Sequence, residues 1–247
     1  MIEPVGAPAQ APLLSIEGLR FRWPKASEDC LAIERFDLLA GETVFLRGPS
    51  GCGKSTLLSL VAGVLTANEG SARLLGHNWR DLSSVRRDRL RADHVGYIFQ
   101  QFNLLPYLSV LDNVLLACRF SARRAAQAGD ARQAAQSLLE RVGLRAADWR
   151  RRAAELSVGQ QQRVAAARAL IGRPDLVIAD EPTSALDEAL RESFMNLLLQ
   201  ACAEAGSALL FVSHDARLAT RFQRQLDLTT INLAGGHAHA ARAEVAR

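Results

Sequence analysis

Short apolar runs of strand length alternate with longer segments of helical period along most of the chain. Runs such as Leu176–Ala179 and Ala208–Val212 are apolar at every position, which is typical of strands buried on both faces of a parallel sheet. Strands are predicted at Leu13–Phe21, Arg35–Leu39, Thr43–Arg47, Val95–Phe99, Leu176–Ala179, Ala208–Val212 and Leu226–Leu233. The alternation predicts an α/β domain with a mostly parallel sheet.

Helices are predicted at Thr56–Val64, from Ser109 toward Cys118, from Ser157 to about Ile171, from Asp187 to about Glu204, and from about Asp215 onward. Two of these starts, Ser109-x-x-Asp112 and Ser157-x-x-Gln160, have the form of a capping box. Residues 109–155 have a mostly helical pattern, broken at Gly129 and Gly143. Because this stretch is too long for one crossover, we expect an inserted helical subdomain at about 101–172.

The composition is that of an ordinary globular protein, with 49% apolar and 23% charged residues among 247. We expect one domain over 13–233, with flexible ends at 1–12 and 234–247. The net charge of +4 is unevenly distributed, because arginines crowd one stretch, at Arg119, Arg123, Arg124, Arg132, Arg141, Arg145, Arg150, Arg151 and Arg152. A solvated helix face is favoured for this stretch, and contact with an acidic partner such as nucleic acid or lipid head groups stays open.

Membrane and redox signals are weak in this sequence. No run of about 18 apolar residues occurs, and the first residues lack a basic segment followed by an apolar one, so we expect no membrane span and no signal peptide. Any membrane role must then come from a partner. The four cysteines form no Cys-x-x-Cys pair and are interpreted as reduced thiols of a cytosolic protein.

A glycine-rich segment between a predicted strand and a predicted helix fits the pattern G-x-x-x-x-G-K-[ST] of a phosphate-binding loop. Glycines let backbone N–H groups turn toward phosphate oxygens, and the helix N-terminus favours an anion. Lys54 supplies a cation to the β- and γ-phosphates of ATP, and Ser55 offers a hydroxyl to Mg²⁺. The candidate phosphate-binding residues are Gly48, Pro49, Ser50, Gly51, Cys52, Gly53, Lys54, Ser55 and Thr56.

Two acids, Asp180 and Glu181, end the apolar strand Leu176–Ala179. A carboxylate at the C-terminal end of a buried strand lies where nucleotides bind in open α/β sheets. Asp180 is a candidate Mg²⁺ ligand, and Glu181 a candidate general base for the attacking water. The alternative is that both acids only cap the next turn, and the phosphate-binding loop makes that alternative weak.

With these motifs in view, the chain resembles the ATP-binding-cassette (ABC) ATPases. Leu156-Ser-Val-Gly-Gln160 is similar to the family signature LSGGQ, with Val158 in place of the first glycine. The resemblance implies that Ser157, Gly159 and Gln160 contact the γ-phosphate held by a second copy. Ser157 also caps a helix whose positive end suits an anion.

Further family motifs follow in the expected order. Gln100 matches the Q-loop glutamine, which in the family reaches the metal and the attacking water. Ser184–Asp187 matches the D-loop, which crosses the dimer interface. Ser213-His214 matches the switch histidine, which contacts the γ-phosphate. The resemblance therefore gives Glu181, His214, Gln100 and Lys54 as catalytic residues, and Ser55, Gln100 and Asp180 as metal ligands.

The adenine ring is expected to stack on an aromatic residue upstream of the phosphate-binding loop. Trp23 aligns with the family's adenine-stacking position, and Phe21 is the competitor. Strand alternation and the adjacent Pro24 favour Trp23 as the exposed ring.

The resemblance covers about 13–233 and implies a P-loop NTPase core, an N-terminal antiparallel β subdomain and the inserted helical subdomain. The segment from Phe99 to Val114 looks most like the lipoprotein-release, macrolide-export and cell-division branch of bacterial ABC ATPases. That branch implies a homodimer that hydrolyses ATP with Mg²⁺ and drives a permease in export or extraction. The apolar residues Phe102, Leu104, Leu105 and Tyr107 are candidates for permease contact, with subdomain core as the alternative.

Three functional classes stay open at this point. The first is a transporter ATPase, located in the cytoplasm on the inner face of the membrane through its permease. The second is a membrane-attached signalling ATPase that controls a periplasmic enzyme without transport. The third is a soluble ABC ATPase acting on DNA, ribosomes or cluster assembly. The third is disfavoured because the chain lacks the long insertions or second cassette of those types, so nucleic acid is not an expected partner.

Overall fold

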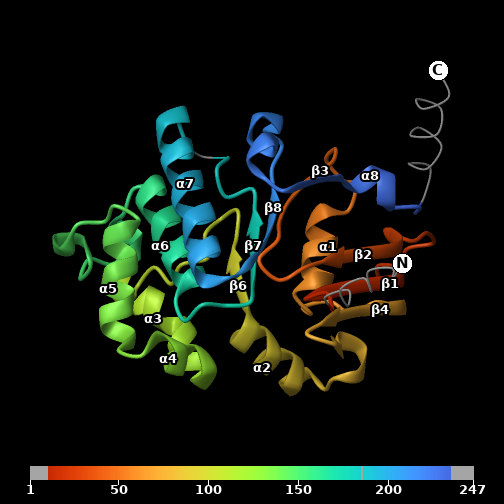
Figure 1. Cartoon of the computed structure of the whole chain (residues 1–247), viewed down its shortest axis with the longest axis horizontal. Coiled ribbons are helices and arrows are strands. Elements are labelled where there is room, and N and C mark those ends of the chain that lie inside the picture. The colour runs from red at the N-terminus through yellow and green to blue at the C-terminus, as the bar shows by residue number, and fades with distance from the viewer. Residues whose placement is uncertain (1–10, 185, 235–247) are drawn as a thin grey trace, which may run out of the picture.

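The protein, seen here as a computed structural model, is described over residues 11–184 and 186–234. Its central parallel sheet has the strand order β6-β7-β8-β3-β9, and a second, antiparallel sheet has the order β2-β1-β4-β5 (Figure 1). The first sheet consists of β3 (Thr43–Arg47), β6 (Val95–Ile98), β7 (Leu176–Asp180), β8 (Ala208–Val212) and β9 (Arg224–Asp227). The second consists of β1 (Leu14–Phe21), β2 (Leu31–Leu38), β4 (Glu69–Leu74) and β5 (His77–Asn78). The expected α/β class is confirmed.

The parallel sheet is buried on both faces because successive residues of a strand point to opposite sides. On one face, Leu46, Ile178 and Leu210 join a core that includes helix α1 (Lys54–Val61) and the antiparallel sheet. On the other face, Val177 and Phe211 pack against α6 (Val158–Leu170) and α7 (Glu188–Ala205). Helix α1 therefore lies between the two sheets, and the loop that precedes it is anchored from both sides.

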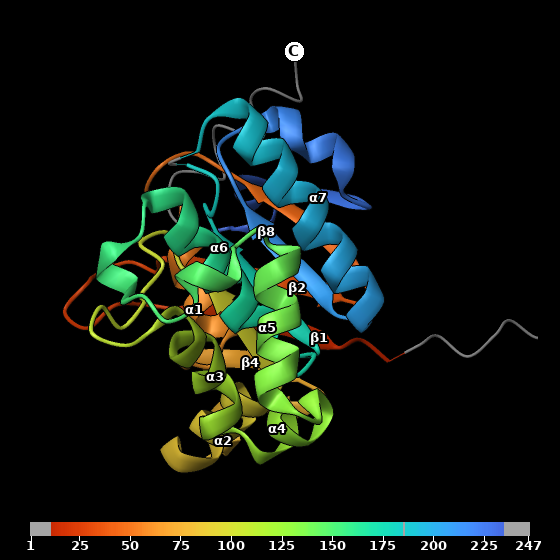
Figure 2. The same ribbon diagram turned by 90° about the vertical axis from the view of Figure 1, so that its left-hand side faces the viewer.

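A helical segment is inserted between β6 and β7 and has a core of its own. It contains α3 (Val110–Phe120), α4 (Ala122–Ala128), α5 (Ala131–Arg141) and α6, which lie together beside the sheet (Figure 2). Ser109 caps α3 by accepting a bond from the Asp112 N–H at 3.0 Å, as its motif predicts. Gly129 and Gly143 follow the ends of α4 and α5, so both predicted breaks are confirmed.

Several predicted boundaries were wrong. The second strand begins at Leu31, four residues before the predicted Arg35, and the first helix begins at Lys54 instead of Thr56. The predicted strand Leu226–Leu233 is instead β9 followed by a short helix, α8 (Leu228–Ile231). Asp227 ends that strand because its carboxylate accepts the Thr229 N–H at 3.0 Å and caps the helix. The segment after Asp215 forms a 3-10 helix, Ala216–Arg221.

The sequence pattern predicts no element between the first helix and Val95, where the structure has β4, β5 and α2 (Ser84–His94). Helix α2 has no buried residue, so its sequence carries no apolar stripe. Among the described residues, no helix has the length and apolar character needed to cross a membrane. The expectation of flexible ends falls almost entirely outside the described ranges.

The arginine-rich stretch is not a uniform solvated face. Arg124 is only 3% exposed, and its Nε donates to the Ile171 carbonyl at 2.8 Å while Nη2 donates to the Ala169 carbonyl at 2.6 Å. These carbonyls lie at the C-terminal end of α6, where a cation is favourable. Arg124 is therefore a structural residue, whereas Arg132 and Arg150 are exposed as the favoured interpretation expects.

Candidate active site

The phosphate-binding loop lies between β3 and α1, as predicted, with all its residues from Gly48 to Thr56 in the strand–loop–helix order. Gly51 and Gly53 have φ values of 80° and 102°, which side chains rarely tolerate, so glycine is required there. Lys54 is 8% exposed, and its Nζ donates to the carbonyls of Gly48 and Pro49 at 2.8 and 2.9 Å. The lysine ammonium thus lies across the loop that would hold the phosphates.

Asn232, which the sequence analysis did not identify, anchors this loop. It is buried, and its Nδ2 donates to the carbonyls of Cys52 and Cys30 at 3.3 and 3.1 Å. Its Oδ1 accepts the Ala32 N–H at 2.9 Å. One amide therefore ties the loop, β2 and the end of the described chain together, and an asparagine 180 positions from Cys52 gives no local signal of this role.

Asp180 ends β7 beside the phosphate-binding loop. Burial is the main cause that raises the pKa of its carboxyl group, and neighbouring Glu181 adds to the rise. The charge of Lys54 and a hydrogen bond with the Ser55 side chain act in the opposite direction. The half-buried Asp180 carboxylate and the Ser55 hydroxyl are oxygen donors that fit Mg²⁺, and the Lys54 ammonium beside them fits a phosphate.

Glu181 and His214 meet at the same sheet edge. Strands β7 and β8 are neighbours, with Asp180 paired to Val212, so the residues that follow them come close together. The distance from His214 Nε2 to Glu181 Oε1 is 2.7 Å. Glu181 has a φ of 45°, an unusual value for a residue with a side chain, and its N–H donates to the Val212 carbonyl at 2.9 Å.

Gln100 follows β6, which pairs with β7 through Ile98 and Ala179, so it lies at the same edge as Asp180. The backbone after it is fixed by Arg168 of α6, a residue that sequence reasoning missed. Its guanidinium donates to the carbonyls of Phe102 and Asn103, both at 2.6 Å. Both residues have positive φ values, 58° and 49°, so the loop takes a sharp path that the arginine stabilises.

The signature segment lies at the N-terminal end of α6, in the helical insertion and not on the sheet edge. Ser157 accepts the Gln160 N–H at 3.3 Å, and the Gln160 side chain accepts the Ser157 N–H at 3.0 Å. The predicted capping box is confirmed. Val158 is 49% exposed, so its side chain faces outward at the position where the family signature has glycine.

Trp23 lies just after β1 and is 45% exposed, whereas Phe21 is 5% exposed and belongs to the core. The two rings meet edge to face with centroids 5.1 Å apart. The same β1–β2 connection approaches α1 at Cys30, whose Sγ is 3.7 Å from Thr56 Oγ1. Of the two candidate rings, only that of Trp23 is free to receive another ring.

Comparison with known proteins places these motifs in a family. The family model described as "ABC transporter" matches residues 33–184. The chain belongs to the ABC transporter family. Within it, the chain is an ATP-binding and ATP-hydrolysing subunit of the type found in lipoprotein-release and macrolide-export transporters.

Two curated relatives and one solved structure of this ABC family define the similarity. The chain is 43% identical over 194 residues to the lipoprotein-releasing system ATP-binding protein LolD of Hydrogenovibrio crunogenus, covering 78% of this chain and 83% of that protein. It is 39% identical over 220 residues to the probable export ATP-binding/permease protein MacB of Pseudomonas entomophila, covering 88% of this chain and 32% of that one. The dimeric, ADP- and Pi-bound cassette MJ0796 matches with a TM-score of 0.78 and 34% identity, covering 87% of this chain and 93% of that one.

Proposed function

We propose that this ABC ATPase works as a homodimer that closes head to tail around two ATP molecules and drives an integral-membrane permease in export or extraction. The observation that carries the proposal is the contact between His214 and Glu181 at the sheet edge where Asp180 ends β7, near Lys54 at the start of α1. This arrangement supports the assignment of a base, a cation and a metal ligand to one phosphate position.

Nucleotide binding is assigned to the loop from Gly48 to Thr56, with the adenine stacked on Trp23. The residues that would hold Mg²⁺ are Ser55, Asp180 and Gln100, and the ion would supply charge neutralisation at the β- and γ-phosphates. The half-buried Asp180 carboxyl beside Ser55 fits such an ion.

Hydrolysis is assigned to Glu181 acting as general base. Its carboxylate accepts a proton from water, whose oxygen attacks the γ-phosphorus of ATP, and the bond to the β-phosphate oxygen breaks to release ADP and phosphate. His214, whose Nε2 lies 2.7 Å from Glu181 Oε1, is assigned to orient that carboxylate and to contact the γ-phosphate. Lys54 stabilises the charge that spreads over the transferred group.

Dimerisation is assigned to the N-terminal end of α6. Ser157 and Val158 are exposed there, and the positive end of the helix is free to face the γ-phosphate bound to the second copy. The solved cassette with 34% identity is described as a dimer in a post-hydrolysis state, which supports the same assembly here.

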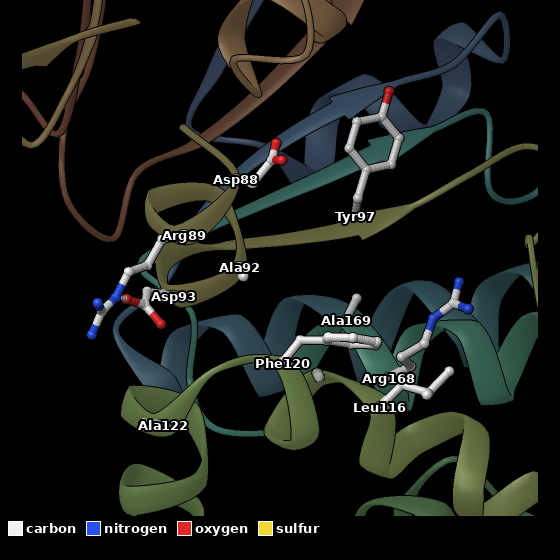
Figure 3. Close-up of a pocket in the computed structure, with 11 residues that line it drawn as sticks. Asp88, Arg89, Ala92, Asp93, Tyr97, Leu116, Phe120, Ala122, Arg168 and Ala169 are labelled. Atoms are coloured by element: carbon white, nitrogen blue, oxygen red, sulfur yellow. Dashed lines mark ion pairs between the residues drawn. The ribbon is translucent and has the colours of Figure 1, made fainter. Parts of the chain in front are cut away.

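Permease docking is assigned to an open cavity of about 700 Å³ between the helical insertion and the sheet (Figure 3). Helices α2 and α3, strand β6 and the C-terminal part of α6 contribute its walls. Phe120, which is 77% exposed, lines it together with Leu116 and Tyr97, beside the charged Arg89 and Asp93. An exposed aromatic ring among apolar and charged lining residues suits a short amphipathic helix.

Two of the candidate contact residues from the sequence belong elsewhere. Phe102 is buried at 8% exposure in the sheet core, and Leu104 packs against that core and the core of the insertion. Tyr107 is 68% exposed and remains available to a partner. Docking through this cavity would hold the ATPase in the cytoplasm against the inner face of the membrane.

The decisive experiment is Glu181→Gln, studied by ATPase assay and by size exclusion with and without MgATP. We expect hydrolysis to fall at least about 100-fold while ATP binding persists, and MgATP to convert the variant into a dimer. Glu192→Gln, an exposed acid on α7, is the matched control and should behave as wild type. Near wild-type turnover in Glu181→Gln would refute the base assignment, and a monomer saturated with ATP would refute dimerisation by ATP alone.

A further inference from the structure

Gln162 is a polar side chain buried deep in the domain. It lies in the second turn of α6, five residues after the cap Ser157, and has 0% exposure. Its Nε2 donates to the backbone carbonyl of Pro182, and its Oε1 has no hydrogen-bond partner in the described part of the chain. A buried amide is costly unless it is bonded, so the contact with Pro182 is the reason that glutamine is tolerated here.

The carbonyl that accepts this bond belongs to the turn that carries Glu181. That turn is tightly folded, because Glu181 has a φ of 45° and the Ser184 N–H donates to the Glu181 carbonyl at 3.2 Å. A residue with a side chain keeps a left-handed conformation only where its surroundings enforce it. On one side the Val212 carbonyl holds the Glu181 N–H at 2.9 Å. On the other side, Gln162 donates a hydrogen bond to the carbonyl of Pro182, the next residue of the turn.

A second contact joins the same two segments. A Cβ on Gly159 would lie 3.6 Å from Leu186 Cδ2 and 3.8 Å from Leu190 Cδ1, so both leucines cover the first turn of α6. Leu186 follows the Glu181 turn and is 9% exposed. The N-terminal end of α6, which carries Ser157, therefore packs against the segment that follows Glu181.

We propose that Gln162 is a positioning residue that couples the signature end of α6 to Glu181 within one subunit. Its hydrogen bond holds the backbone of the Glu181 turn in a fixed position relative to α6. When the nucleotide of a second copy binds Ser157, the position of α6 therefore determines the position of the Glu181 carboxylate, which acts on the chain's own ATP. This coupling rests on the proposed roles of Glu181 and Ser157. It adds a route between the two sites of a dimer that passes through the interior of each subunit.

The test compares Gln162→Met, which removes the amide at nearly constant length, with Gln161→Met. Gln161 is the matched control because its Nε2 bonds to the Leu156 carbonyl within its own segment at 3.1 Å. We expect kcat of Gln162→Met to fall about tenfold, the effect of one lost positioning bond, with KM for ATP and the Kd of a fluorescent ATP analogue within about twofold. The control should keep wild-type kcat. Unchanged kcat in folded Gln162→Met, or a KM that rises as much as kcat falls, would overturn the coupling.

A double-mutant cycle separates positioning from general stability. In the Glu181→Gln background, Gln162→Met should cause no further loss of residual hydrolysis, because its effect is exerted through the Glu181 carboxylate. A further tenfold loss in that background would show an independent effect and overturn the proposal. If Glu181→Gln alone keeps its turnover, the assignment of Glu181 as the base is wrong. If Glu181→Gln is inactive and Gln162→Met is fully active, the base assignment stands and only the coupling through Gln162 is wrong.

Gln162→Glu adds a signature that a packing role would not produce. A neutral carboxyl can donate to the Pro182 carbonyl, whereas a carboxylate repels it, and burial raises the pKa of a carboxyl group. The kcat of Gln162→Glu relative to wild type should therefore rise as pH is lowered from 8 to 6. If the ratio of the two kcat values stays flat or falls as pH is lowered, the hydrogen bond to the Pro182 carbonyl is not the contact through which residue 162 acts.

Discussion

His214 Nε2 lies 2.7 Å from Glu181 Oε1, although the two residues are 33 positions apart in the sequence. Each follows the C-terminal end of a strand, and β7 and β8 are adjacent in the sheet. The imidazole is half exposed while the carboxylate is only 17% exposed, so the histidine forms the outer side of the pair. A carboxylate that a neighbouring side chain orients can accept a proton only from a water molecule on one side of it.

His214→Ala should reduce kcat at least about 100-fold, because in the proposed mechanism it removes both the group that orients Glu181 and a donor to the γ-phosphate. ATP affinity, measured with a fluorescent analogue, should change little because the phosphate-binding loop is untouched. His77→Ala, at an exposed position on β5, is the control. Retention of most activity in His214→Ala would show that Glu181 needs no partner.

Trp23→Ala should raise the Kd for ATP about 3- to 10-fold, the loss of one aromatic stacking contact, with kcat at saturation nearly unchanged. Trp23→Tyr should restore affinity to within about twofold, since a ring of either type can stack. Val64→Ala, at another exposed apolar position, controls for surface effects. An unchanged Kd in Trp23→Ala would remove Trp23 from the nucleotide site.

Arg124→Met should destabilise the fold by about 2–4 kcal/mol, because it leaves buried carbonyls at the end of α6 without donors. Burial lowers the pKa of Arg124 to about 10, so the guanidinium stays charged at neutral pH and its bonds are charge-assisted. The melting temperature should fall by about 5–12 °C, whereas Arg132→Met on exposed α5 should have no such effect. If Arg124→Met has the melting temperature of wild type, Arg124 does not stabilise the fold more than an exposed arginine does.

Asp215 supplies a stability contribution that depends on pH. A hydrogen bond from Arg217 is the main cause that lowers the pKa of Asp215 from 3.8 to about 2, and Arg191 pairs with it at 2.8 Å. A lowered folded-state pKa stabilises the protein above pH 4, and that contribution is lost as pH falls toward 2. Asp215→Asn should therefore melt about 1–3 °C below wild type at pH 7 and 5, with a smaller gap at pH 3.5. If the difference in melting temperature between Asp215→Asn and wild type grows toward acid pH, the pKa of Asp215 is not lowered in the folded state.

Much of the fold and most of the candidate site residues could be read from local patterns. The glycines of the phosphate-binding loop, the acids after an apolar strand and the Ser157 capping box each follow from chemistry within a few residues. The helices and strands with strong apolar periods were predicted to within a few positions. Helix α2 was missed because all its side chains are at least partly exposed.

The residues that the sequence did not reveal act across long separations. Gln162 meets Pro182, Arg168 meets the loop after Gln100, and Asn232 meets Cys52, and none of these side chains has a local motif. Glutamine, arginine and asparagine in these segments are all compatible with a solvated surface. Only packing shows that Gln162 and Asn232 are buried and therefore must bond to a backbone group.

The sequence by itself determined which chemical groups are present: a candidate phosphate-binding loop, a candidate metal-binding acid, a candidate base and a capped helix end. The tertiary structure decided how these parts are related, by placing β8 between β3 and β7 so that His214 lies between the phosphate-binding loop and Glu181 in strand order. It also decided that Glu181 occupies a left-handed backbone held from both sides. The physical reason is that local propensity depends on neighbours in sequence, whereas strand order and buried hydrogen bonds depend on which distant segments share one core.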